Sequence, residues 1–296
     1  MHSPAALYSP SSLELLLARY RDEWTAPPTE FMQTELGTRV RRAFYDPHRN
    51  MDGEYSLRAL SGILGEEVFQ FIHLLQSIDE AEGSWTMAEI GAGYGRWLVA
   101  GARTVRRVRS LPAHLIAVEA EDAHFEMLKL HLSDNGFDPN DHHLIKGAAS
   151  GKDGHVFFTQ GHAAEWYGQA IIPSEDSGFG DWPKATVVTV PSFSLATILG
   201  EADRVDYLDM DIQGAELDAV SAAIDVLSSK VRRLQIGTHS QSIEDGLRSI
   251  LSDAGWQCQC DYACGATALT PFGRIAFVDG SQGWANPSLR VGPELG

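Results

Sequence analysis

The chain lacks long apolar runs and is poor in cysteine. No stretch of about 18 consecutive apolar residues occurs in its 296 residues, so we expect no transmembrane helix and no membrane partner. The first residues carry no basic segment ahead of their apolar residues, so we expect no secretory signal. The odd count of three cysteines favours reduced thiols and a cytoplasmic location. Their C-x-C-x3-C spacing, over 258–264, does not favour a zinc site.

Basic residues are also scarce. Lys and Arg number 23 against 40 Asp and Glu, which gives a formal net charge of -17. Because nucleic acids are bound by Lys and Arg that face phosphates, we expect no nucleic-acid partner. The basic stretch 103–109 is interpreted as the solvated end of a helix.

Residues 1–84 show helical spacing of apolar residues without strand alternation, which predicts an N-terminal helical cap. The predicted helices begin after a cap at Ser11 or Ser12, and continue over about 29–44 and 56–81. These helices are expected either to cover the site or to form a homodimer interface.

From residue 85 onward, strand and helix patterns alternate. The predicted strands of a parallel sheet are 86–92, 114–120, 143–150, 205–212 and 231–240. Helices of ordinary length separate most of them, which is typical of βαβ units. The predicted fold of residues 85–280 is therefore α/β, a doubly wound, largely parallel, Rossmann-like sheet.

Further strands are expected outside this parallel series. Segments 155–160 and 186–194 are predicted to pair around the insertion 161–185, which is interpreted as a lid or as a surface loop. Segments 256–263 and 273–280 are expected to close the sheet as an antiparallel pair. The remaining residues, 281–296, are expected to form a tail.

The stretch EIGAGYGRW follows the first predicted strand and places glycines at 91, 93 and 95. Ligands of doubly wound sheets bind at the carboxyl ends of the strands, where glycine lets a loop approach them closely. A dinucleotide site needs G-x-G-x-x-G, whereas the spacing here is G-x-G-x-G. Glu89 would repel a diphosphate but suits the ammonium and sulfonium groups of S-adenosylmethionine. Glu119, which ends the second strand, is placed to accept hydrogen bonds from ribose hydroxyls, so the pattern favours S-adenosylmethionine as cofactor.

Residues 87–278 resemble the FkbM family of S-adenosylmethionine-dependent methyltransferases. The resemblance rests on EIGAGYGRW, AVEAEDAHFEMLKLHLSDNG, LIKGAASGKDGHVFF and SFSLATILGEADRVDYLDMDIQGAELDAV. The last stretch matches the family pattern at Asp211, Gly214, Ala215 and Glu216. It departs from that pattern where Asp209 replaces a usual Lys and Gln213 a usual Glu. The resemblance implies O-methylation of a hydroxyl group on a small molecule, either a sugar or a natural product.

The resemblance also implies which residues surround the cofactor. In chain order they are Glu89, Gly91, Gly93, Tyr94, Glu119, Ala120, Ala148, Ala149 and Asp209. The methionine end of the cofactor would contact Glu89 and Gly91. The ribose would contact Glu119, and the three alanines would lie near the adenine.

Two candidate catalytic residues end adjacent predicted strands. Asp211 closes the fourth strand and His239 the fifth, so their side chains are expected to converge above the transferred methyl group. His239 is predicted to act as the general base for the acceptor hydroxyl. The alternatives are that Asp211 caps the following helix and that His239 bonds a loop. No metal is expected; if a divalent ion binds, Asp211 and His239 are its ligands, with Asp209 as a third candidate.

Two other functions stay open at this point. A nicotinamide-dependent oxidoreductase would need the third glycine spacing and a Tyr-x3-Lys pair, neither of which we find. A catalytically inactive, methyltransferase-like binding module would have no reason to retain Glu89 and Glu119.

Overall fold

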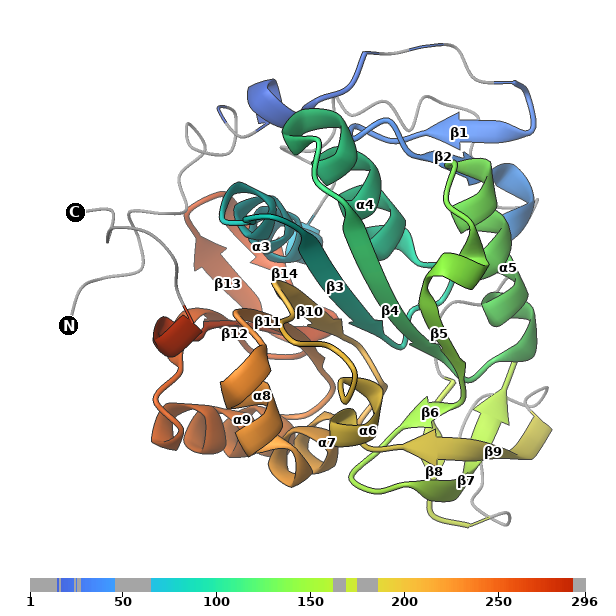
Figure 1. Cartoon of the computed structure of the whole chain (residues 1–296). Coiled ribbons are helices and arrows are strands. Elements are labelled where there is room, and N and C mark those ends of the chain that lie inside the picture. Colours follow the sequence, from blue (N-terminus) through green and yellow to red (C-terminus); the bar gives the residue numbers. More distant parts are fainter. Residues whose placement is uncertain are drawn as a thin grey trace.

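The computed structural model describes residues 15, 17–23, 25, 28–45, 65–161, 169–174 and 186–289. Its centre is a seven-stranded sheet in the order β12-β15-β11-β10-β3-β4-β5 (Figure 1). Five strands are parallel neighbours: β3 (Trp85–Ile90), β4 (Ala113–Glu119), β5 (His143–Lys146), β10 (Tyr207–Met210) and β11 (Arg233–Thr238). The chain runs outward from β3 to β5 and then returns to β10 on the other side of β3. The order of the strands therefore reverses between β3 and β10, where such sheets bind ligands.

Helices cover both faces of this sheet, as the doubly wound prediction requires. One face carries α3 (Val68–Asp79), α4 (Arg96–Arg109) and α5 (Asp122–Asp134), which share a core with Trp85 and Met87 of β3. The opposite face packs Ala88 and Ile90 against the other helices: α6 (Leu195–Ile198), α7 (Glu216–Ala222), α8 (Ile224–Lys230) and α9 (Gln241–Asp253). Because both faces are covered, β3 is buried along its whole length.

A four-stranded sheet lies beside the end of β5, in the order β6-β9-β7-β8 (Figure 1). It consists of β6 (Ala148–Ala149), β7 (Gly154–Gln160), β8 (Ile171–Ile172) and β9 (Thr186–Phe193). The predicted pairing of 155–160 with 186–194 is confirmed, since β7 and β9 are antiparallel. The strand predicted over 143–150 is instead divided at Gly147 between the two sheets. A side chain at Gly147 would crowd Phe193 and the carbonyl of Pro191, so the chain turns there at a glycine.

The helix predicted over 29–44 is wrong. This segment forms a hairpin of β1 (Phe31–Gln33) and β2 (Arg39–Arg41), followed by the 3₁₀ helix η2 (Arg42–Phe44). Gly37 turns the hairpin with a φ of +81°. The hairpin is held on α5 by the ion pair between Arg41 and Asp134 and by a hydrogen bond from the Arg39 amide to Asn135. Tertiary contacts of this kind override a weak local helical pattern.

The other two N-terminal helices are only partly within the described residues. Residues 17–20 are helical, whereas Ser11 and Ser12 lie outside the described part. For 56–81, the described portion is confirmed as the 3₁₀ helix η4 (Gly65–Glu67) followed by α3. α3, which the sequence places in a cap, packs directly on the sheet beside α4.

The closing strands also differ from the prediction. β12 (Gln257–Tyr262) does enter the sheet, but it pairs with β15 (Gly280–Ala285), which also pairs antiparallel with β11. Residues 281–285, assigned to a tail, are thus a buried interior strand. β14 (Gly273–Ala276) pairs instead with β13 (Thr267–Thr270) in a separate hairpin. The short 3₁₀ helices η5 (Pro139–Asp141) and η6 (Pro287–Leu289) complete the described elements.

Within the described ranges, none of the helices has both the length and the apolar character needed to cross a membrane.

Candidate active site

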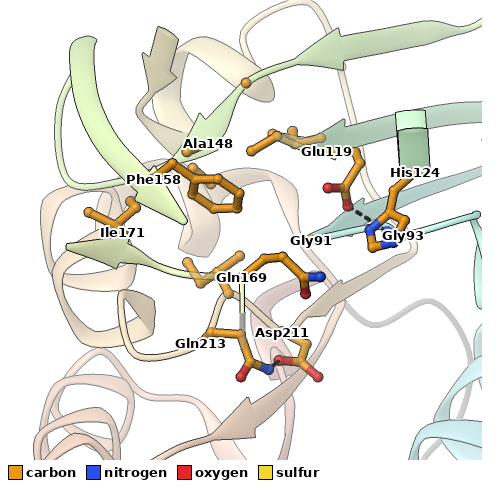
Figure 2. Close-up of a pocket in the computed structure, with 15 residues that line it drawn as sticks. Gly91, Gly93, Glu119, His124, Ala148, Phe158, Gln169, Ile171, Asp211 and Gln213 are labelled. Atoms are coloured by element: carbon orange, nitrogen blue, oxygen red, sulfur yellow. Dashed lines mark hydrogen bonds between the residues drawn. The ribbon is translucent and has the colours of Figure 1, made fainter. Parts of the chain in front are cut away.

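A pocket of about 630 Å³, partly open to solvent, lies where the strand order reverses, at the carboxyl ends of β3, β4 and β10 (Figure 2). Five segments line the pocket: the turn at 91–95 (the glycine turn), the end of β4, the turn between β5 and β6, the four-stranded sheet (the small sheet) and the segment after β10. The lining residues are Gly91, Gly93, Val118, Glu119, Ala120, His124, Gly147, Ala148, Ala149, Phe158, Gln169, Ile171, Asp211, Ile212 and Gln213.

The glycine turn serves packing as well as the pocket. A Cβ on Gly91 would overlap the carbonyl oxygen of Asp211, because the end of β10 passes directly against the turn. A Cβ on Gly95 would overlap Leu128 of α5. Gly91 and Gly93 line the pocket, whereas Gly95 has its space filled by the neighbouring helix. The close approach that these glycines allow is therefore largely to the protein itself.

Glu119 ends β4 and presents its carboxylate to the pocket, beside Gly93 and His124 (Figure 2). Its Oε2 accepts a hydrogen bond from the Gly93 amide at 2.6 Å, and its Oε1 accepts one from the Glu121 amide at 2.8 Å. Burial raises the pKa of Glu119 to about 7, although these amide bonds oppose the shift. Each carboxylate oxygen retains a lone pair for a hydroxyl group of a ligand.

Glu89 lies beneath the turn and does not line the pocket. Its side chain is buried and accepts hydrogen bonds from the amides of Trp97 and Leu98, at 3.2 and 2.9 Å, so it caps the first turn of α4. Burial, followed by the charge of Asp209, raises its pKa well above the ordinary value. The carboxylate predicted to face a cofactor cation thus holds the helix that supports the pocket.

Tyr94 and Asp209 are also placed away from the pocket surface. The Tyr94 hydroxyl lies 2.6 Å from that of Tyr45, and its ring packs on Phe44 on the side facing the N-terminal hairpin. Asp209 is buried within β10 and accepts hydrogen bonds from Tyr207 and Gln70. Burial, followed by the charge of Asp211, raises the pKa of Asp209 to about 7. Asp209 is buried whereas Asp211 lines the pocket, although residues two apart on a strand point to the same side. The reason is that β10 ends at Met210, so Asp211 belongs to the following loop.

The structure does bring Asp211 and His239 together, as predicted. The Nε2 atom of His239 lies 3.3 Å from Oδ1 of Asp211, and its Nδ1 lies 2.9 Å from Oε1 of the fully buried Glu216. Asp279, which the sequence analysis did not consider, adds a third carboxylate 3.6 Å from Nε2. Burial lowers the pKa of His239, but its interactions with the carboxylates of Asp211 and Glu216 outweigh burial and raise the pKa to about 10. His239 is therefore protonated at neutral pH and is poorly suited to the general-base role assigned to it.

The alternative prediction, that Asp211 caps the following helix, is wrong. Helix α7 begins at Glu216, and it is the Glu216 side chain that accepts the amides of Ile212 and Gly214. Asp211 instead lines the pocket, where the Gln213 side-chain amide donates to its Oδ1 at 2.8 Å (Figure 2). Its side chain retains 40% exposure, so it is available to a ligand.

Several lining residues were missed by the sequence analysis. Phe158 and Ile171 come from β7 and β8, and Gln169 precedes β8. Their role depends on how the small sheet folds against β4 and β6, which no local pattern reveals. His124 could have been predicted from the sequence, because it is a polar residue in the first turn of the helix that follows the acidic strand end at Glu119. Residues 162–168 and 175–185 of the predicted insertion, including Trp166, Tyr167 and Trp182, lie outside the described residues.

Comparison with known proteins identifies the family of the chain. The model of the methyltransferase FkbM domain matches residues 90–262, more than half of the chain. A protein of Jannaschia sp. (strain CCS1), named as a candidate methyltransferase, is 28% identical over 243 residues, which cover 81% of this chain and 86% of that protein.

Solved structures with a similar arrangement include two methyltransferases. A methyltransferase FkbM of Methylobacillus flagellatus KT is 15% identical, with a TM-score of 0.41 over 76% of this chain and 57% of that one. The human methyltransferase 10 domain containing protein is 13% identical, with a TM-score of 0.42 over 75% and 82% of the two chains.

Proposed function

The chain belongs to the FkbM methyltransferase family, and we propose that its pocket binds S-adenosylmethionine and directs the methyl group to a hydroxyl group of a small molecule, a sugar or a natural product. Membership of the family implies S-adenosylmethionine as methyl donor. The observation that carries the proposal is the charge of the pocket. Its acidic side chains are Glu119 and Asp211, and no Lys or Arg occurs among the described residues that line it.

This lining fits a positively charged cofactor better than a dinucleotide. A diphosphate in the pocket would face two carboxylates without a cation to balance it, which is costly in a partly buried site. S-adenosylmethionine carries a sulfonium and an ammonium group and no phosphate. The acidic lining therefore supports the methyltransferase over the nicotinamide-dependent oxidoreductase, although Glu89 does not contribute to it.

The lining offers contacts for each part of the cofactor. Glu119 can accept hydrogen bonds from the ribose hydroxyls, and the Gly91–Gly93 turn adjoins it for the methionine end. Ala120 and Ala148 leave room for a flat ring, and the Phe158 side chain covers the same region (Figure 2). When bound, S-adenosylmethionine supplies an electrophilic methyl group. The chain's contribution is to orient the acceptor oxygen in line with that group and to exclude water.

The acceptor side of the pocket is formed by Asp211 and Gln213. In an O-methylation the acceptor oxygen bonds the methyl carbon, the sulfur keeps the electron pair of the broken bond, and the hydroxyl proton must leave. Asp211 is the carboxylate on the pocket surface that is placed to orient that hydroxyl. The side chains of Asp211 and Gln213 can hydrogen-bond a neutral polyol, whereas an anionic acceptor would meet carboxylates with no Lys or Arg among the described lining residues. Small hydroxyl compounds, rather than nucleic acids, are therefore the proposed acceptors.

Calorimetry with S-adenosylmethionine, S-adenosylhomocysteine and NAD tests the proposal. We expect both sulfur compounds to bind with one site per chain and NAD to give no heat of binding. A second assay should follow methyl transfer to a panel of sugars and hydroxylated natural products, with the product's methyl group located by NMR. Binding of NAD alone would overturn the proposal. Cofactor binding with methylation of nitrogen or carbon would refute the hydroxyl acceptor, and binding without transfer to any acceptor would favour an inactive binding module.

A further inference from the structure

We propose that Asp211, His239 and Asp279 form a binding site for a divalent cation of the Mg²⁺ or Mn²⁺ class at the edge of the pocket. One donor atom of each side chain lies within 4.8 Å of the others. The three residues come from distant parts of the sequence. Asp211 follows β10, His239 follows β11 and Asp279 precedes β15, and the pairing of Thr238 with Gly280 brings the last two together.

The imidazole is oriented as in known metal sites. Its Nδ1 lies 2.9 Å from the carboxylate of Glu216, which is completely buried and is itself fixed by the amides of Ile212 and Gly214. Histidine ligands of metals are commonly held in this way, with the second ring nitrogen bonded to a carboxylate. The arrangement leaves Nε2 directed toward Asp211 and Asp279.

The free nitrogen provides a second, separate observation. The Nε2 atom of His239 is buried and lies 3.3 Å from Asp211 and 3.6 Å from Asp279, but neither contact has the geometry of a hydrogen bond. A buried polar nitrogen without a hydrogen bond is costly, so such an atom usually indicates a missing partner. A cation bonded to Nε2 would be that partner.

The distances are close to those of a metal centre. Adjacent oxygen or nitrogen ligands about 2.1 Å from an octahedral ion are about 3 Å apart. Here Nε2 is 3.3 Å from Asp211 Oδ1 and 3.6 Å from Asp279 Oδ1. Shifts of a few tenths of an ångström would therefore bring Nε2 to ligand spacing from each carboxylate, and both carboxylates retain exposure, at 40% and 31%, so an ion can enter.

The local charge also favours a cation. Among the described residues, the ion pairs of Asp211, Glu216 and Asp279 are all with His239, and none is with Lys or Arg. Three carboxylates thus share one imidazole, and a divalent ion would balance the excess. Two carboxylate oxygens and one imidazole nitrogen are a ligand set that Mn²⁺ and Mg²⁺ accept, with positions left for water or substrate.

The consequence for chemistry rests on the proposed function. Because Asp211 also lines the pocket, an open coordination position would face the acceptor and could lower the pKa of its hydroxyl. The ion would thereby favour loss of the hydroxyl proton, a role that His239, with Nε2 bound to the ion, could not take as a general base. Asp279, rather than the buried Asp209, completes the ligand set.

Titration of the purified full-length chain with Mn²⁺ in about 0.15 M salt, followed by the electron paramagnetic resonance signal of the free ion, tests the site directly. We expect one Mn²⁺ per chain in the wild type and an affinity at least about 10-fold lower in Asp279→Asn and in His239→Asn. Asp253→Asn, at an exposed position on α9, should bind Mn²⁺ as the wild type does and controls for adsorption to an acidic surface. Competition by Mg²⁺ should displace the bound Mn²⁺.

Absence of a Mn²⁺ site in the wild type, or an unchanged affinity in Asp279→Asn, would overturn the inference and leave His239 as a structural ion-pair partner. Thermal unfolding of each variant checks that it is folded; if His239→Asn is not, the partly exposed Asp279 decides. S-adenosylmethionine binding measured on the same samples separates the two proposals. Binding of Mn²⁺ without binding of the cofactor would refute the proposed function but not the metal site. Binding of the cofactor without binding of Mn²⁺ would refute the metal site but not the proposed function.

Discussion

Glu119 shows at the scale of one residue how burial and hydrogen bonding prepare a ligand site. Its two backbone hydrogen bonds fix the carboxylate at the end of β4, and burial raises its pKa to about 7. Glu89, only a strand away, has the same chemical group but is committed to the first turn of α4. Position relative to the strand end, and not residue type, decides which carboxylate can meet a ligand.

Replacing Glu119 tests its role. Glu119→Gln should weaken S-adenosylmethionine binding by about 1.5–3 kcal/mol, or roughly 10- to 100-fold, because a hydrogen bond to a charged acceptor becomes a neutral one. Calorimetry measures the loss. Glu126→Gln, at an exposed position on α5, should bind as the wild type does. An equal affinity in Glu119→Gln would remove Glu119 from the binding site.

The raised pKa of Glu119 predicts a pH dependence. Ribose hydroxyls are best accepted by the ionised carboxylate, so cofactor affinity should rise as the pH increases through about 7. Below that value, protonation of the free enzyme should weaken binding by up to about tenfold per pH unit. Calorimetry between about pH 5.5 and 7.5 should show this slope in the wild type and none in Glu119→Gln. A flat profile in the wild type would contradict the assignment.

The strand β15 shows most clearly where the structure differs from the sequence-based prediction. The buried parallel strands and their helices follow from apolar runs and regular spacing, so β3, β4, β10 and β11 could be predicted within a few residues. β15 could not, because its sequence GSQGWA is poor in strand formers. Gly283 is required there because a side chain would overlap the ring of His73 on α3. The local sequence does not reveal this contact between distant residues. Because β15 was not predicted, the position of Asp279 beside His239 was not predicted either.

The junction between the glycine turn and β10 can be tested with a matched pair of substitutions. Gly91→Ala should lower the free energy of unfolding by about 2–5 kcal/mol, since it combines an unfavourable φ of +79° with overlap of the Asp211 carbonyl. Gly255→Ala has a similar φ of +83° but open space around it, and should cost only about 1–2 kcal/mol. Chemical denaturation measures both. Equal losses would show that the contact with Asp211 does not constrain the turn.

At the scale of the whole molecule, charge and topology act together. The chain carries a formal net charge of -17, and its pocket, at the point where the order of the parallel strands reverses, is lined by two acidic residues and by no Lys or Arg among the described residues. The fold class and the position of the pocket follow from the alternation of strands and helices. The full set of Asp211, His239 and Asp279 could not be predicted, because Asp279 reaches the other two only through the pairing of β15 with β11.

The net charge of the chain predicts that the protein does not bind nucleic acids. Fluorescently labelled RNA and duplex DNA should show no change in anisotropy with this protein at about 0.15 M salt, because phosphates would approach a strongly acidic surface. Binding that weakened steeply with added salt would indicate a local basic surface and would reopen the question of the acceptor.

The most direct measurement is a crystal structure of the protein with S-adenosylhomocysteine. We predict that the ribose hydroxyls will lie within hydrogen-bonding distance of the Glu119 carboxylate, with the sulfur atom turned toward Asp211. The ligand bound elsewhere, or in the pocket without contact to Glu119, would contradict the account.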